Sequence, residues 1–199
     1  AHATMKQNVT TGGKRKFIMV QVQEKCDEKT DAYKNGYSNI FDIGKERIRR
    51  AAKKLQEDNP ETEFDGGFRV LKLDEGNMNP VYYSVDRYSQ GMLTALESNI
   101  KEDRTGLDLL FGCLLEWGLP LSFPYSSEQI EGCTVHNYND GDLIACFDEN
   151  VPDNVVKEIA KRQPLRAVFR DSSFANSPSK INVGEIFKLL APDTKVKVI

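Results

Sequence analysis

The sequence lacks the features that mark several classes of protein. None of its apolar runs approaches the roughly 20 residues that a membrane-spanning helix needs. It has only two histidines, and its four cysteines are scattered with no Cys-x-x-Cys pair, so we expect no metal site. Scattered thiols and the absence of a secretory leader predict a cytoplasmic location with no membrane attachment.

A strong net charge is also missing. The 199 residues carry a formal charge of −3, so no basic field covers the whole surface, and any contact with nucleic acid requires a local basic patch. With 39% hydrophobic and 29% charged residues, the composition is that of an ordinary globular chain. Its length allows one sizeable core or two small domains.

The most informative stretch begins at Gly12 and ends at Glu24. The residues before it predict the end of a helix, and Phe17–Val22 predicts a short buried strand. The strand closes in Gln21, Gln23 and Glu24, and open α/β sheets place ligand contacts at such polar strand ends. These three side chains are candidates for binding a nucleoside's hydroxyl groups. The alternative is an ordinary solvated strand end.

Residues 42–57 predict the clearest helix. One face carries Ile48, Ala51, Ala52 and Leu55 at helical spacing. The other faces are rich in lysine and arginine, and Arg47, Arg50 and Lys53 are candidates for contacting DNA phosphates. The alternative is a solvated helix face in which Glu46 pairs with Arg49 or Arg50.

The remaining helices and strands are predicted from hydrophobic periodicity and from the positions of glycine and proline. A strand is predicted over Phe68–Leu73, a helix over 91–100, and an apolar helix over Leu107–Trp117 that Gly118 ends. Trp117 is expected at a packing edge, with base stacking as the alternative. Beyond a domain boundary near residues 103–106, the sequence predicts a small α/β sheet with parallel crossovers. Its elements are strands at Thr134–Tyr138 and Leu143–Phe147 joined as a hairpin by Asn139–Asp142, a helix from Pro152 to Gln163, a strand at Leu165–Phe169, a helix at Asn182–Leu190 and a strand at Lys195–Ile199.

Several of these motifs together resemble one family. They are Ala1–Met5, Gly13–Gln21, Asp42–Ala51, Gly67–Asp74 and Gly118–Leu121. The resemblance is to the modification (methyltransferase) subunit of type III restriction–modification systems, and it extends over nearly the whole chain. It implies the C-terminal portion of an adenine-specific DNA methyltransferase.

The resemblance carries expectations about fold, cofactor and partners. It implies an α/β fold, with a partial Rossmann-like methyltransferase sheet in residues 1–104 and a small α/β module in residues 105–199. It also implies S-adenosylmethionine as methyl donor and, as partners, double-stranded DNA, a second modification subunit and the restriction subunit. The family's glycine-rich cofactor loop and catalytic tetrad would lie upstream of Ala1. We therefore expect no catalytic residue in this chain and no methylation by it alone.

The residues also allow three other functional hypotheses. Asn79-Pro80-Val81-Tyr82 is similar to the tetrad of amino-methyltransferases, but valine replaces its second proline, so a connecting turn is favoured. Residues 105–199 could form a non-catalytic subunit-assembly or dimerisation module. Asp148 and Asp171 each follow a strand and could hold Mg²⁺ in a nuclease-like unit, or could be loop acids and helix caps.

Overall fold

The computed structural model describes residues 1–79, 100–174 and 177–199. The chain divides into two compact units, Ala1–Lys72 and Leu73–Ile199. Among the described residues, no helix has the length and apolar character needed to cross a lipid bilayer. The predicted helix over 91–100 lies outside the described residues.

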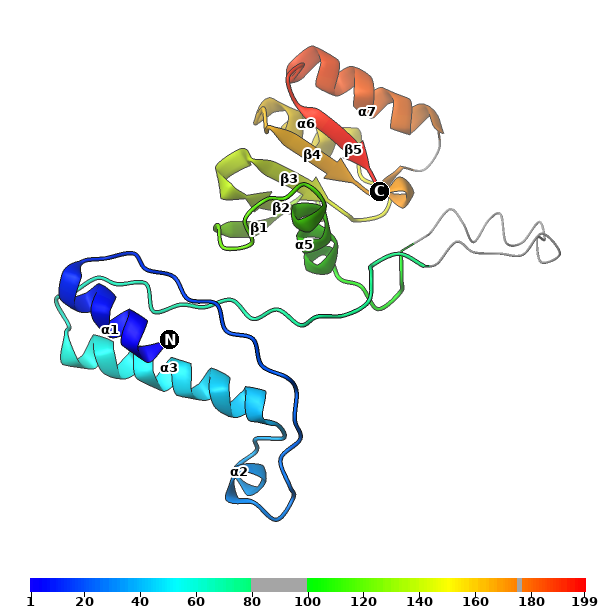
Figure 1. The fold of residues 1–199 in the computed structure, drawn as a ribbon. Coiled ribbons are helices and arrows are strands. Elements are labelled where there is room, and N and C mark those ends of the chain that lie inside the picture. The colour runs from blue at the N-terminus through cyan, green and yellow to red at the C-terminus, as the bar shows by residue number, and fades with distance from the viewer. Residues whose placement is uncertain (80–99, 175–176) are drawn as a thin grey trace. The chain divides into compact units, whose positions relative to one another are not determined.

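The first unit is built on two helices that lie side by side (Figure 1). They are α1 (His2–Thr11) and α3 (Ile40–Asp58), with the single turn α2 (Asp31–Lys34) between them in sequence. The Asn39 side chain caps α3 by accepting a 2.9 Å hydrogen bond from the Asp42 N–H. The buried side chains of the helices are Met5 of α1 and Leu55 of α3. Leu55 belongs to the apolar face predicted for residues 42–57, whose other members, Ile48, Ala51 and Ala52, are half-buried.

Two strand predictions in this unit are wrong. Residues 13–24 and 62–72 form no strand ladder, and the only bridge in the unit joins Lys25 to Asn39. Ile18 and Val20 are 93% and 92% exposed, and Val70 and Leu71 are also exposed. The physical reason is that a strand is stabilised by neighbouring strands, and residues 1–72 supply none.

The described residues of the second unit form a five-stranded mixed sheet with three α-helices. The strands are β1 (Tyr125–Ile130), β2 (Cys133–Tyr138), β3 (Leu143–Cys146), β4 (Arg166–Phe169) and β5 (Lys195–Val198), in that spatial order. The first three are antiparallel, and β3–β4 and β4–β5 are parallel. The helices are α5 (Gly106–Glu116), α6 (Asp153–Lys161) and α7 (Ser177–Leu190). Short 3₁₀ turns span Asn139–Gly141 and Asp171–Ser173.

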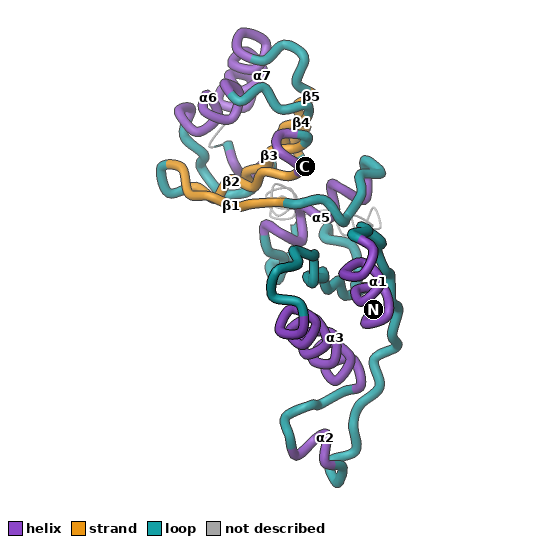
Figure 2. Tube along the Cα trace, turned by 90° about the vertical axis from the view of Figure 1, so that its left-hand side faces the viewer, coloured by secondary structure: helices purple, strands orange, loops and turns teal. Residues whose placement is uncertain are grey.

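The helices cover the sheet on both faces (Figure 2). α6 and α7 cover one face because consecutive right-handed crossovers in one direction put both helices on the same side. Their core includes Val155, Ile159 and Phe187 together with Ile144 and Phe169 of the sheet. α5 covers the other face, where its leucines pack on Tyr138, Leu143 and Val168.

Most of the predicted C-terminal elements are confirmed. The hairpin is present, with Tyr138 opposite Leu143, and the turn uses left-handed residues at Asn139, Asp140 and Gly141. The strands at 165–169 and 195–199 and the helices at 107–117 and 182–190 are present with shifted ends. Pro152 is the N-cap residue of α6 rather than its first helical residue. The sequence did not predict β1.

Candidate functional site

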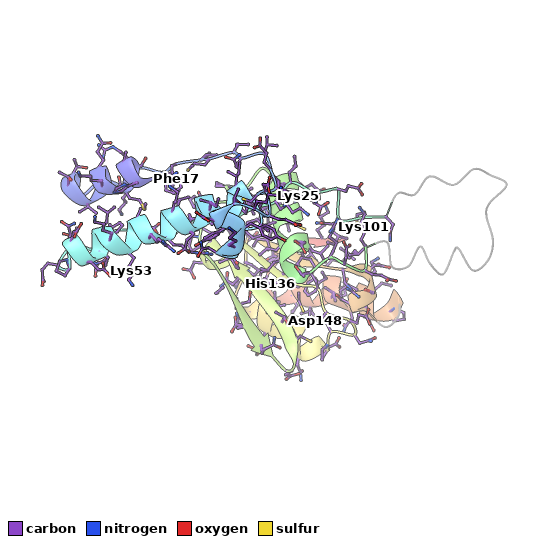
Figure 3. The ribbon with its side chains drawn as sticks, turned by 90° about the horizontal axis from the view of Figure 1, so that it is seen from below. Phe17, Lys25, Lys53, Lys101, His136 and Asp148 are labelled. Atoms are coloured by element: carbon purple, nitrogen blue, oxygen red, sulfur yellow. The ribbon has the colours of Figure 1, made fainter. Side chains whose placement is uncertain are left out.

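The predicted cofactor residues lie together on the extended chain that follows α1 and Phe17 (Figure 3). Gln21, Gln23 and Glu24 are all exposed, and Gln21 Nε2 donates a 3.0 Å hydrogen bond to the carbonyl of Val22. A shallow pocket of about 460 Å³ in this unit lies elsewhere, near the C-terminal end of α3, and is lined by Gln56, Pro60, Thr62, Glu63, Phe64 and Asp65. In this unit the three side chains therefore do not enclose a ligand.

The three predicted DNA-binding residues lie on α3, from which Lys53 projects in Figure 3. Arg50 Nε lies 2.7 Å from Glu46 Oε1, and this hydrogen bond raises the pKa of Arg50. The predicted pairing of Glu46 is thus confirmed for Arg50. Lys53 Nζ lies 3.8 Å from Glu57, whereas Arg47 is exposed and forms no ion pair within the described part of the chain.

Among the described residues, Asn79, Asp148 and Asp171 do not come together with one another in the pairings that the sequence suggested. Asn79 Nδ2 donates a 3.5 Å hydrogen bond to the Ile100 carbonyl, and Tyr82 lies outside the described residues. Asp171 pairs with Lys180, while Asp148 accepts a hydrogen bond from the Thr134 N–H. No cluster of three metal-ligating groups in residues 1–79, 100–174 and 177–199 includes Asp171.

Trp117 lies at the edge of the core, and two cations lie close to its ring. The guanidinium carbon of Arg166 and the amine of Lys197 each lie 5.7 Å from the centre of its ring, which packs against the α5 side of the sheet. Lys197 also pairs with Glu116. The position is the packing edge that the sequence predicts, and long cationic side chains cover much of such a ring.

The structure forms a polar pair that the sequence did not reveal. Ser127 and His136 are directly opposite each other in the β1–β2 ladder, and Ser127 Oγ lies 2.7 Å from His136 Nδ1. His136 is 5% exposed, and burial lowers the pKa of its imidazole. A Cβ atom on Gly106 would lie 2.7 Å from His136 Nε2, so the ring packs directly on the start of α5.

A second unexpected group contains two thiols and a carboxylate. The ligand atoms of Cys133, Cys146 and Asp148 all lie within 4.8 Å of one another. Both cysteines are buried and free, and Asp148 is half-buried. The cysteines are separated by a hairpin, so no short spacing motif marks them. The hairpin register is what brings the three residues together. Val135 lies opposite Cys146, and continuing the same antiparallel register by two residues places Cys133 opposite Asp148.

Two known proteins are similar in sequence to part of this chain. No family model matches it. Over 73 residues, 37% of the chain, it is 42% identical to the Type III restriction-modification enzyme StyLTI Mod subunit of Salmonella typhimurium, covering 11% of that protein. It is 40% identical over 73 residues to the EcoP15I Mod subunit of Escherichia coli, covering 10% of that protein. The chain therefore matches about a tenth of the length of these relatives. Over those 73 residues it is related to the Mod subunits of type III restriction-modification enzymes.

Proposed function

We propose that this chain is part of the modification subunit of a type III restriction–modification enzyme, an adenine-N6 DNA methyltransferase that uses S-adenosylmethionine. The observation that carries this proposal is the identity of about 40% to two Mod subunits over 73 residues. Residues 1–104 would contribute to the methyltransferase domain, and residues 105–199 would form an appended α/β module. Its proposed location is the cytoplasm, which suits its free cysteines.

In this proposal the chain supplies binding surface rather than catalysis. The sequence holds no glycine-rich cofactor loop and no intact Asn/Asp-Pro-Pro-Tyr tetrad. Gln21, Gln23 and Glu24 are exposed and form no enclosed site within their unit, so they do not fit S-adenosylmethionine unaided. We therefore assign no step of the reaction to them. Their proposed role is to complete a cofactor site that other parts of the enzyme supply.

The proposed DNA contacts come from α3. Arg47 has no competing carboxylate within the described residues, whereas Arg50 and Lys53 would exchange Glu46 and Glu57 for phosphate oxygens. These surface pairs oppose binding only weakly, since exposed ion pairs contribute about 0–1 kcal/mol. The helix can therefore offer three cations to a phosphate backbone.

The first experiment compares the whole enzyme with this chain. Both are incubated with duplex DNA and isotopically labelled S-adenosylmethionine, and the modified nucleoside is identified by mass spectrometry. We expect N6-methyladenine from the whole enzyme and no product from the chain alone. Methylation by the chain alone would refute its non-catalytic role. Methylation of cytosine by the whole enzyme would refute the adenine assignment.

A second experiment tests the α3 surface by fluorescence anisotropy with labelled duplex DNA and the whole enzyme. Arg47→Ala and Lys53→Ala should weaken binding, and each should lower the slope of affinity against salt by roughly one. Lys34→Ala is the matched control, because Lys34 is an exposed lysine on α2 that already pairs with Asp31. Equal effects of all three substitutions would argue against a specific role for α3.

The module of residues 105–199 is the proposed contact to a second modification subunit or to the restriction subunit. The supporting feature is β1, an edge strand whose residues 125–129 are exposed and whose outer side pairs with no described strand. Such an edge can accept a strand from a partner. Sedimentation velocity over a concentration series should show reversible self-association of the chain. A single monomeric species at every concentration would leave the restriction subunit as the proposed partner.

A further inference from the structure

Two of the four cysteines meet a carboxylate at one end of the β2–β3 hairpin. Cys133 is the first residue of β2, Cys146 is the last of β3, and Asp148 follows two positions later. Residues 146 and 148 share one face of an extended strand, as do residues 133 and 135. Because Val135 lies opposite Cys146, the register brings both sulfur atoms and the carboxylate to the same face, within 4.8 Å of one another.

In this cluster of Cys133, Cys146 and Asp148, the two sulfur atoms are buried in the protein and the carboxylate is partly exposed to solvent. Cys133 and Cys146 are 7% and 0% exposed and border the core under α6 and α7, while Asp148 is half-buried at the strand end (Figure 3). The Thr134 N–H donates to Asp148 Oδ2 and fixes its orientation. A hydrogen bond of this kind orients a metal ligand.

The donor set selects a class of cation. Two sulfur atoms and one carboxylate oxygen suit Zn²⁺ and similar borderline ions, whereas Mg²⁺ and Ca²⁺ prefer oxygen ligands alone. With Zn–S bonds of about 2.3 Å, two sulfurs on a tetrahedral ion lie roughly 3.8 Å apart. The two sulfur atoms would therefore close in by no more than about 1 Å.

We propose that Cys133, Cys146 and Asp148 form a binding site for Zn²⁺ or a similar borderline divalent cation, with the fourth coordination position open to water. Binding forms two metal–sulfur bonds and one metal–oxygen bond. It displaces two thiol protons to the solvent, so the occupied site carries one net negative charge. The inference stands on the β2–β3 geometry and is independent of the methyltransferase assignment.

The surroundings of the two cysteines explain why both thiols keep their protons when no cation is bound. Burial raises the pKa of Cys146 to about 12, and burial together with the charge of Asp148 raises the pKa of Cys133. Neutral thiols are compatible with the surrounding core, as buried thiolates would not be. A bound cation reverses this preference because a coordinating thiol loses its proton.

The test uses Co²⁺ as a spectroscopic probe of the reduced, metal-free chain. Tetrahedral thiolate coordination gives visible d–d bands and a sulfur-to-metal charge-transfer band in the near ultraviolet. We expect both bands to saturate at one Co²⁺ per chain and to disappear when Zn²⁺ is added. In weakly buffered solution, Zn²⁺ binding should release two protons per chain. Absence of the bands would overturn the proposal.

Variants assign the bands to residues. Cys133→Ser and Cys146→Ser should each weaken the charge-transfer band by about half or more, and Asp148→Asn should lower the affinity at least about tenfold. Cys26→Ser is the matched control, because Cys26 is a free cysteine outside the cluster. Asp148→Asn, at a half-buried strand end, also covers the case in which a cysteine variant fails to fold. Loss of the bands in Cys26→Ser alone, or a Cys133–Cys146 disulfide found by mass spectrometry under reducing conditions, would refute the site.

Discussion

His136 Nδ1 lies 2.7 Å from Ser127 Oγ, on the residue directly opposite it in the β1–β2 ladder. The serine is exposed on the edge strand, while the imidazole is buried and lies between the sheet and the start of α5. Burial penalises the charged ring and lowers the pKa of His136, although the Asp148 carboxylate partly opposes this shift. The folded protein therefore favours the neutral imidazole more than the unfolded chain does, and two predictions depend on the position of His136.

The first prediction concerns stability against pH. Below about pH 6.5 the unfolded chain protonates this histidine more readily than the folded chain does, so the unfolded state binds more protons. The free energy of unfolding should therefore fall as the pH drops from about 7.5 to 5.5. Urea denaturation followed by Trp117 fluorescence measures this, since the single tryptophan lies in the same unit. His136→Gln should remove this dependence of the free energy of unfolding on pH. His2→Gln should keep it, because His2 is exposed on α1. An unchanged slope in His136→Gln would contradict the prediction.

The second prediction compares two glycines in helices. Gly184 lies within α7 with open space around its Cα, so Gly184→Ala should stabilise the unit by about 1 kcal/mol. Gly106→Ala should instead destabilise it by roughly 1–3 kcal/mol, because the new Cβ would lie 2.7 Å from His136 Nε2 and the ring is held by Ser127. The same urea titration reads both variants. Equal stabilisation by the two substitutions would show that the His136 ring moves freely.

Local patterns explain why much of the fold could be predicted. The helices α5 and α6 bury apolar residues along one face, α3 buries Leu55 on its predicted apolar face, and the Asn139–Gly141 turn determines the β2–β3 register. By contrast, β1 is an edge strand with the polar sequence Tyr125–Ile130, exposed along nearly its whole length. Such a strand lacks the alternation of apolar and polar residues that predicts a strand, so no pattern in the sequence indicated β1.

Long-range relationships account for the other differences. The β-forming residues of Phe17–Val22 predict a strand, but that tendency produces a strand only where neighbours supply backbone partners. The cluster of Cys133, Cys146 and Asp148 was missed because no short motif marks its cysteines. The predicted hairpin contained the missing information, since pairing Tyr138 with Leu143 also fixes which residues face each other farther along.

The third prediction concerns the start of α5. Thr105 Oγ1 accepts a 3.3 Å hydrogen bond from the Asp108 N–H, and the Asp108 carboxylate accepts a 2.8 Å hydrogen bond from the Thr105 N–H. Both bonds satisfy backbone groups that a helix end leaves unpaired. Thr105→Ala should lower the free energy of unfolding by about 1 kcal/mol. Ser126→Ala, at an exposed position of β1, is the control and should change it by less than about 0.5 kcal/mol.

The fourth prediction decides between the exposed segment seen in the structure and the buried strand predicted from the sequence. Ile18 and Val20 are almost fully exposed, so the double substitution Ile18→Asp and Val20→Asp removes no buried contact. It should leave thermal unfolding, followed by circular dichroism, unchanged within about 0.5 kcal/mol. It should also reduce binding of a hydrophobic dye, because two exposed apolar groups are replaced by charges.

Met5→Asp is the control for this comparison, since Met5 is 1% exposed within the helical pair and an unpaired charge there should destabilise the unit by several kcal/mol. If the double variant instead lost as much stability as Met5→Asp, Phe17–Val22 would be a packed strand in solution. That strand would require a partner outside residues 1–72. If the partner is a second copy of the chain, the lost stability should depend on protein concentration. A concentration series of melting curves for the unsubstituted chain therefore completes the test: independence from concentration supports the exposed segment.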